Sequence, residues 1–125
     1  MRTLILVMLG GAFGTGFRYS LSSFVHLAVK QSKFPLATFI VNLSGSFLIG
    51  LLAEAFASRY PVSPALRAAV LAGVLGGYTT FSSFSFETLS LIRGGDLWLA
   101  ALNVSASVLL GLAGVWAGMR FAQMI

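Results

Sequence analysis

Charged side chains are scarce in this chain, and the residue types that most often carry catalysis are nearly missing. Only 9% of the 125 residues are charged, whereas about a quarter are charged in a typical soluble domain. Cysteine is absent, so disulfides and thiol chemistry are excluded. The sequence therefore does not indicate whether the protein works in an oxidising or a reducing compartment. One histidine and three scattered acidic residues form no catalytic or metal-binding cluster. We therefore expect no enzyme activity.

Long uncharged stretches take the place of the missing charge. Hydrophobic residues make up 58% of the chain, the mean hydropathy is +0.94, and a helix of about 20 residues crosses a bilayer core. The uncharged stretches cover residues 3–17 (resuming after Arg18), 34–53, 68–86 and 97–119. We predict an all-α membrane protein, a single domain over 1–125, with four transmembrane helices at approximately 3–29, 35–56, 66–92 and 97–121.

The N-terminal stretch has a second interpretation, because Arg2 followed by an apolar run also begins a signal peptide. No small-residue cleavage site leads from this run into a polar region, and three further apolar stretches follow it. A first membrane helix is therefore the favoured interpretation.

Basic residues are more frequent than acidic ones, giving a net charge of +5. They form no stripe, so we expect no nucleic-acid binding. With four spans, one side of the membrane receives Arg2, Arg59, Arg67 and Arg120. The other side receives Lys30, Lys33 and Arg93. Because a Lys/Arg excess on one side sets orientation, this near balance predicts dual topology, with copies inserted both ways and paired antiparallel as a homodimer.

Small residues recur at four-residue spacing in all four stretches. Gly10 with Gly14, Gly73 with Gly77, Gly114 with Gly118, and Ser46 with Gly50 all show it. This spacing lets helix backbones approach closely in lipid, and tight packing within one bundle is its expected role.

The second stretch carries a narrow polar stripe made of Thr38, Asn42 and Ser46. An amide in hydrocarbon is costly without a partner. Asn42 therefore either makes an interhelical hydrogen bond or lines a polar pathway, and its neighbours on the stripe favour the pathway.

The third stretch ends in GGYTTFSSFSF at residues 76–86, where hydroxyl and aromatic side chains replace aliphatic ones. We predict a break in the third helix at Gly76-Gly77, because glycine loses helical hydrogen bonding most cheaply. Backbone carbonyls released at such a break can bind a hard monovalent cation such as sodium. Beyond the break, Phe81 and Phe84 share a helix face.

Hydroxyls, an amide and ring edges offer hydrogen-bond donors and positive quadrupole edges. Together they predict a path for a small, strongly hydrated anion. Arg18 either raises the anion concentration at one mouth or snorkels to the interface, and both interpretations are open. Asn103, Ser105 and Ser107 of the fourth stretch supply a further polar strip.

The motifs GGxxGxxxRY, VNLxGSFLIG and GGYTTFSSFSFE, in the first, second and third stretches, resemble the Fluc (CrcB) family of fluoride channels along almost the whole chain. The third motif is the specific one. The resemblance implies a dual-topology antiparallel homodimer in the bacterial cytoplasmic (inner) membrane, with two pores and a structural sodium ion that is required but not transported. It also implies passive, fluoride-selective export that protects the cell from fluoride toxicity.

The resemblance assigns roles to individual positions. Phe81 and Phe84 match the pore phenylalanines, Asn42 the pore amide, and the carbonyls of Gly76 and Thr79 the sodium ligands. Arg18 matches the vestibule arginine and Glu87 the acid that closes the motif. The remaining expected pathway residues are Thr80, Ser82, Ser83, Ser85, Asn103, Ser105 and Ser107.

Two other function classes compete with a channel. Small multidrug-resistance transporters are also four-span proteins, but they need a carboxylate deep in the first helix, and the first stretch has no acid. A non-conducting scaffold would not explain why hydroxyls, Asn42 and a glycine pair converge near mid-depth.

Overall fold

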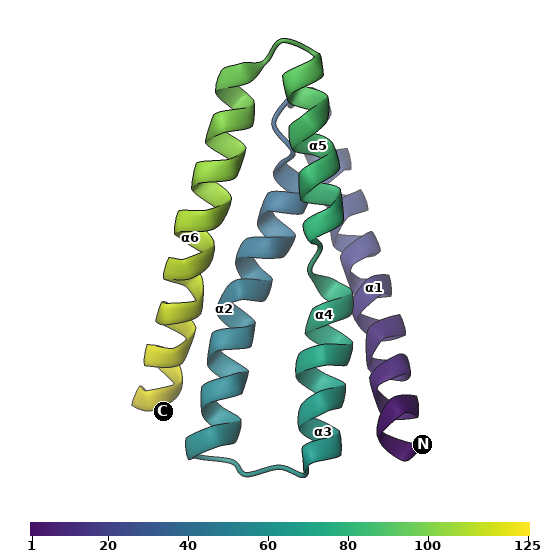
Figure 1. Cartoon of the computed structure of the whole chain (residues 1–125), viewed down its shortest axis with the longest axis vertical. Helices are drawn as coiled ribbons and strands as arrows, with labels where there is room; N and C mark the ends of the chain where they lie inside the picture. The colour runs from purple at the N-terminus through teal and green to yellow at the C-terminus, as the bar shows by residue number, and fades with distance from the viewer.

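The computed structural model describes all residues, 1–125, and every regular element is a helix (Figure 1). The helices are α1 (Arg2–Ala28), α2 (Leu36–Ser58), α3 (Pro64–Ala68), α4 (Gly76–Tyr78), α5 (Phe81–Arg93) and α6 (Leu97–Met124). A π-helical segment, Ala69–Leu75, joins α3 to α4. The segments Arg2–Ala28, Leu36–Ser58, Pro64–Arg93 and Leu97–Met124 are long and apolar enough to cross a membrane. The prediction of an all-α protein with four such helices is confirmed.

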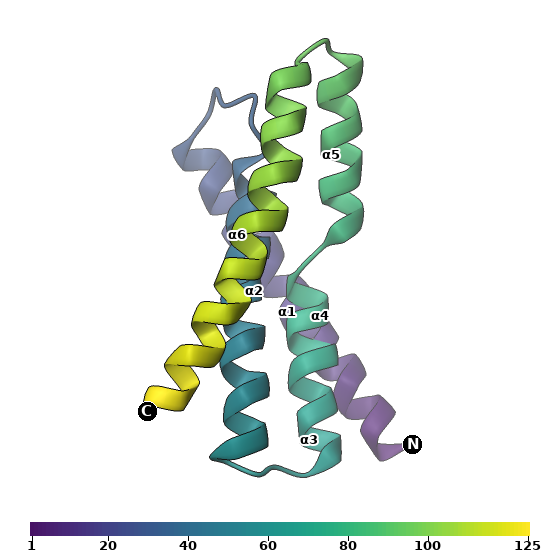
Figure 2. The ribbon, with the colours of Figure 1, turned by 60° about the vertical axis from the view of Figure 1, so that its left-hand side comes forward.

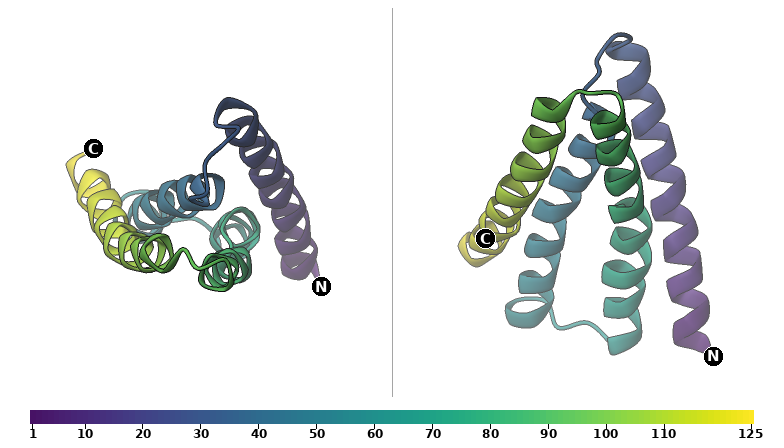
Figure 3. Two further views of the ribbon diagram at one scale, coloured as in Figure 1. Left: turned by 90° about the horizontal axis from the view of Figure 1, so that it is seen from above. Right: turned by 45° about the horizontal axis from the view of Figure 1, so that its top comes forward.

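The helices are arranged in two closely packed pairs. α2 packs along α6, and α1 packs along the π-helical segment and α4. Seen from above, α1 and α6 lie at opposite ends of the arrangement, with α2 and the third span between them (Figure 3). Both chain termini lie at the same end as the connection between α2 and α3 (Figures 1 and 2), as four spans require.

Glycines make the close approach within each pair possible. A Cβ atom on Gly14 would meet the backbone at Val74 and Tyr78, and one on Gly77 would meet the backbone of Gly11. Between α2 and α6, a Cβ atom on Gly118 would meet the carbonyl of Phe47. These glycines therefore do the close packing that their spacing predicts.

Gly14→Ala is expected to destabilise the chain by about 1–3 kcal/mol, the usual cost of overpacking, because backbone atoms cannot move aside as a side chain can. Gly16→Ala is the matched control, since a Cβ there meets nothing within 4 Å. Thermal unfolding in detergent measures both. Equal midpoints for the two variants would contradict the close approach of α1 to α4.

The third span is broken, but two residues later than the sequence predicts. Gly76 is helical (φ −65°, ψ −36°), and the backbone becomes extended at Thr79 (φ −83°, ψ 160°) and Thr80 (φ −151°, ψ 121°). The predicted position of the break, Gly76-Gly77, is therefore wrong. Gly77 serves close packing on α1, and the helix opens where other helices supply hydrogen-bond partners for the freed backbone.

Most of the chain's surface is apolar. Only 18 of the 125 residues are buried, and large apolar side chains are exposed at many positions of α1, α5 and α6. In a membrane, lipid tails or another protein surface cover such faces. The antiparallel homodimer stays a prediction, because the structure describes a single chain.

Candidate functional site

Asn42 on α2 holds the break in the third span. Its Nδ2 donates to the Thr80 carbonyl at 2.9 Å, and its Oδ1 accepts from the Thr80 backbone N–H at 2.8 Å. The Thr80 hydroxyl then caps α5 by accepting from the Ser83 backbone N–H at 3.2 Å. Both backbone groups of Thr80 are thus satisfied without a helix, which non-helical backbone at membrane depth requires. One hydrogen of the Asn42 amide stays free for a further bond.

The same bonds change the surroundings of two carbonyls. In a continuous helix the N–H of Thr80 would donate to the Gly76 carbonyl, and that of Ser83 to the Thr79 carbonyl. Both N–H groups donate to side chains instead. Arg18 Nη1 donates to the Thr79 carbonyl at 3.2 Å, which leaves that oxygen one lone pair. The two freed carbonyls are the two that the resemblance implies as sodium ligands.

A groove of about 300 Å³ lies beside the break, and we call it the phenylalanine groove. Its lining comes from α2, the π-helical segment, the break, α5 and α6, and it includes Asn42, Ser46, Phe81, Phe84 and Ser107. The Phe81 and Phe84 rings lie 5.6 Å apart between centroids at an interplanar angle of 41°. Aromatic rings and hydroxyls therefore border the same space.

The hydroxyls at the start of α5 divide into two groups. Thr80, Ser82 and Ser83 form a cluster in which the Thr80 hydroxyl lies 3.3 Å from Ser82 Oγ and 3.2 Å from Ser83 Oγ. Ser85 is exposed and donates to the Phe81 carbonyl of its own helix at 3.0 Å. The cluster, and not Ser85, lies at the break.

The three predicted pathway residues of α6 lie in different environments. Ser107 lines the phenylalanine groove. Asn103 is 1% exposed and donates to Thr88 Oγ1 at 2.9 Å, so it joins α6 to α5. Ser105 is exposed and donates to the Ala101 carbonyl at 2.8 Å. The structure brings only Ser107 to the groove, and pathway roles for Asn103 and Ser105 stay predictions.

A second cavity, of about 310 Å³, also borders Thr80, and we call it the polar pocket. Its polar lining comes from α1, α2 and α5. The lining residues that carry polar side chains are Thr15, Arg18, Tyr19, Ser22, His26, Thr38, Thr80, Ser83 and Glu87. Arg18, placed at a vestibule by the resemblance, lies here with its guanidinium toward the break.

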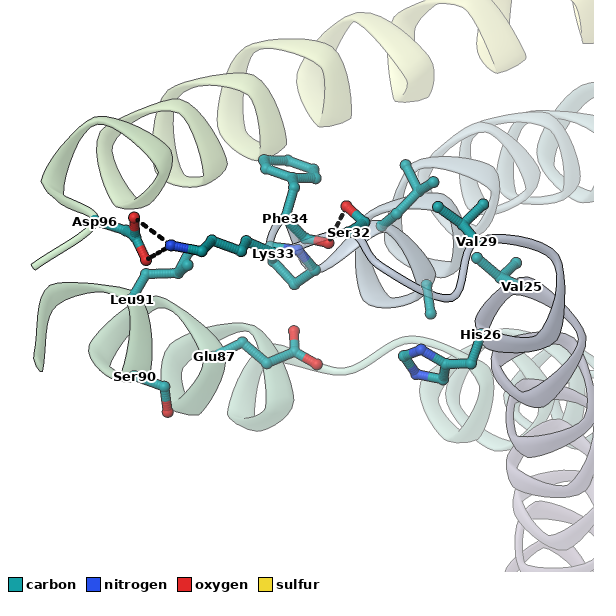
Figure 4. Close-up of a pocket in the computed structure, with 13 residues that line it drawn as sticks. Val25, His26, Val29, Ser32, Lys33, Phe34, Glu87, Ser90, Leu91 and Asp96 are labelled. Carbon is teal, nitrogen blue, oxygen red and sulfur yellow. Dashed lines mark hydrogen bonds and ion pairs between the residues drawn. The ribbon is translucent and has the colours of Figure 1, made fainter. Parts of the chain in front are cut away.

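A third cavity, of about 360 Å³, lies under the loop between α1 and α2, and we call it the loop pocket (Figure 4). Lys33 of that loop forms a salt bridge of 3.3 Å with Asp96, at the start of α6. His26 and Glu87 also line this pocket.

The three cavities form a series, because each has lining residues in common with the next. Thr80 lines both the phenylalanine groove and the polar pocket, and His26, Ala37 and Glu87 line both the polar pocket and the loop pocket. The series offers hydroxyl, amide and guanidinium donors from the broken helix to the loop end. Such a series can replace the hydration shell of a small anion.

The sequence indicated no role for the single histidine, His26, and gave Thr38 only a position on the polar stripe of the second stretch. Thr38 Oγ1 donates to Glu87 Oε1 at 2.8 Å, and this bond joins residues 49 positions apart. The spacing of Thr38 and Asn42 on one face of α2 was the available signal, because that face meets the polar pocket and the break.

Residues 5–119 match the family described as CrcB-like protein, Camphor Resistance (CrcB). The chain belongs to the CrcB family. Its relatives include proteins named fluoride-specific ion channel FluC from Geotalea daltonii, 45% identical over 100% of both chains, and from Geobacter sulfurreducens, 43% identical over 100% of both. A third, from Solibacter usitatus, is 43% identical over 95% of this chain and 97% of its own.

The CrcB relatives bear on two predictions. They are named as ion channels and not as enzymes, in line with the missing catalytic clusters. They are bacterial proteins, and this CrcB chain has four membrane-length helices. It is therefore a multi-pass bacterial membrane protein.

Proposed function

We propose that this chain forms a fluoride-selective ion channel that lets fluoride leave the cytoplasm passively, down its electrochemical gradient, across the inner membrane. One observation carries the proposal: a donor-lined series of cavities runs along a break in a membrane helix, beside the Phe81 and Phe84 rings. The choice of fluoride as the ion rests on the names of the CrcB relatives. Fluoride is small and strongly hydrated, so many donors are needed to replace its water, and a narrow route excludes larger halides.

The deciding experiment is anion efflux from liposomes that contain the purified protein. Fluoride and chloride release are measured side by side with ion-selective electrodes, and protein-free liposomes give the background. Rapid fluoride release without chloride release is the expected result. Release of neither ion would contradict a channel and would make proton-coupled transport of organic cations the next test.

The working unit in this proposal is an antiparallel homodimer with a structural sodium ion that is required and not transported. Two features support it. The Gly76 and Thr79 carbonyls lose their helical donors, and carbonyl oxygens suit a hard monovalent cation. A Cβ on Gly76 would meet nothing within 4 Å in one chain, so the single chain gives no packing reason for glycine there. The carbonyls of Gly76 and Thr79 would hold the ion, and its charge would draw the two copies together.

Gly76→Leu is therefore expected to leave the single chain's packing intact while it prevents dimer assembly and abolishes fluoride efflux. Crosslinking in liposomes measures assembly, and the efflux assay measures conduction. Replacing sodium with N-methylglucamine throughout purification should reproduce both losses in the unmodified protein. A stable, conducting Gly76→Leu dimer would contradict the cation site.

A further inference from the structure

Glu87 carries a carboxylate oxygen that the route described above does not explain. Its Oε1 accepts a hydrogen bond from Thr38, but its Oε2 is buried and has no hydrogen-bond partner. Buried polar atoms are nearly always paired, so each unpaired one needs an explanation. An ionised carboxylate here also lies on the proposed route of an anion and repels it.

His26 is the group that faces this carboxylate. Figure 4 shows the imidazole of His26, from α1, and the carboxylate of Glu87, from α5, turned toward each other across the cavity. Both residues line the polar pocket and the loop pocket. Both residues therefore belong to the lining that the two pockets share, and we call the space between their side chains the neck.

Other charged or titratable groups line the two pockets on either side of this neck. Arg18 and Tyr19 line the polar pocket, and Lys33 and Asp96 line the loop pocket. Arg18 is bonded to the Thr79 carbonyl, and Lys33 pairs with Asp96. Side chains of these four types ordinarily keep one charge state between about pH 6 and 8. Histidine is the type whose charge ordinarily changes in this range.

We propose that His26 and Glu87 form a proton-dependent binding position for fluoride at the neck between the polar pocket and the loop pocket. With His26 neutral, the carboxylate is the dominant charge and it disfavours the anion. With a proton on His26, the pair has no net charge and the imidazolium N–H groups are donors. The neck then accepts fluoride, and flux rises as the pH falls. This inference rests on the proposed fluoride conduction.

The test is fluoride efflux at pH 8 and pH 6, with the same pH on both sides of the liposome. Hydrogen fluoride itself crosses lipid, so the rate from protein-free liposomes is subtracted at each pH. The wild type is expected to conduct about fivefold faster or more at pH 6, the lower end of usual coupling between two binding events. A wild type that conducts equally at both values overturns the inference and leaves the channel standing. No fluoride release at either pH contradicts the channel itself.

Two substitutions of His26 fix the charge of this side chain in opposite states, one neutral and one positive. His26→Gln stays neutral and should give the wild-type pH 8 rate at both pH values. His26→Lys stays charged and should give a rate near that of the wild type at pH 6 at both values. Ser20→Ala, an exposed α1 residue bonded to its own helix, is the control and should keep the wild-type ratio. If either folded His26 variant also keeps the wild-type ratio, the proton-dependent position is wrong.

Discussion

Replacing Asn42 with alanine is expected to abolish fluoride efflux and to weaken the fold. Alanine leaves the backbone N–H and carbonyl of Thr80 without their partners at 2.8 and 2.9 Å. An unsatisfied buried group costs about 1–3 kcal/mol, and here two are created at the break. Asn42 also lines the phenylalanine groove, so its remaining donor is lost from the route. Efflux should fall at least about 100-fold, which corresponds to roughly 3 kcal/mol of barrier.

Asn42→Asp separates the two effects. The carboxylate can still accept from the Thr80 N–H, but it cannot donate to the Thr80 carbonyl, and it adds a negative charge beside the groove. Its unfolding midpoint in detergent should lie between those of the wild type and Asn42→Ala, while its efflux should be as low as that of the alanine variant. Wild-type efflux from Asn42→Ala would mean that Arg18 and the Thr80 cap hold the break without the amide.

Phe81→Ile and Phe84→Ile are each expected to slow fluoride efflux by about tenfold, with the chain still folded. Isoleucine keeps apolar bulk but has no positive ring edge to offer an anion. An aromatic edge contact of about 1.4 kcal/mol corresponds to a tenfold change in rate. Both side chains line the groove and their rings lie 5.6 Å apart, so the double variant should lose more than either single one.

Phe86→Ile is the matched control on the same helix, because Phe86 is about as exposed as Phe81 (74% against 79%) but does not line the groove. It should conduct like the wild type in the liposome assay. Normal conduction by both Phe81→Ile and Phe84→Ile would place the anion route elsewhere. An equal slowing by Phe86→Ile would point to a general effect on α5.

The sequence alone was sufficient for the membrane fold and for the residue types that line the proposed route. Uncharged stretches of membrane length can be buried only in lipid or protein, so composition determined four helices. Residues 79–85 could also be recognised as unusual, because hydroxyls replace aliphatic side chains there. The four-residue spacing of Gly10 with Gly14, and of Gly73 with Gly77, likewise predicted close packing, because two residues four apart lie on the same face of a helix.

Tertiary structure decided where the third helix breaks and which residues line the polar pocket. Local propensity favoured Gly76-Gly77, but the helix opens at Thr79 and Thr80 because Asn42, 38 residues away from Thr80, satisfies the backbone there. His26 and Glu87 line the same two pockets only because the packing brings α1 and α5 to the border of both. The partner of each of these side chains is set by how the helices pack. In a chain this apolar, many packings would bury a similar area of surface. The spacing of residues along one helix therefore cannot reveal which residue on another helix becomes the partner.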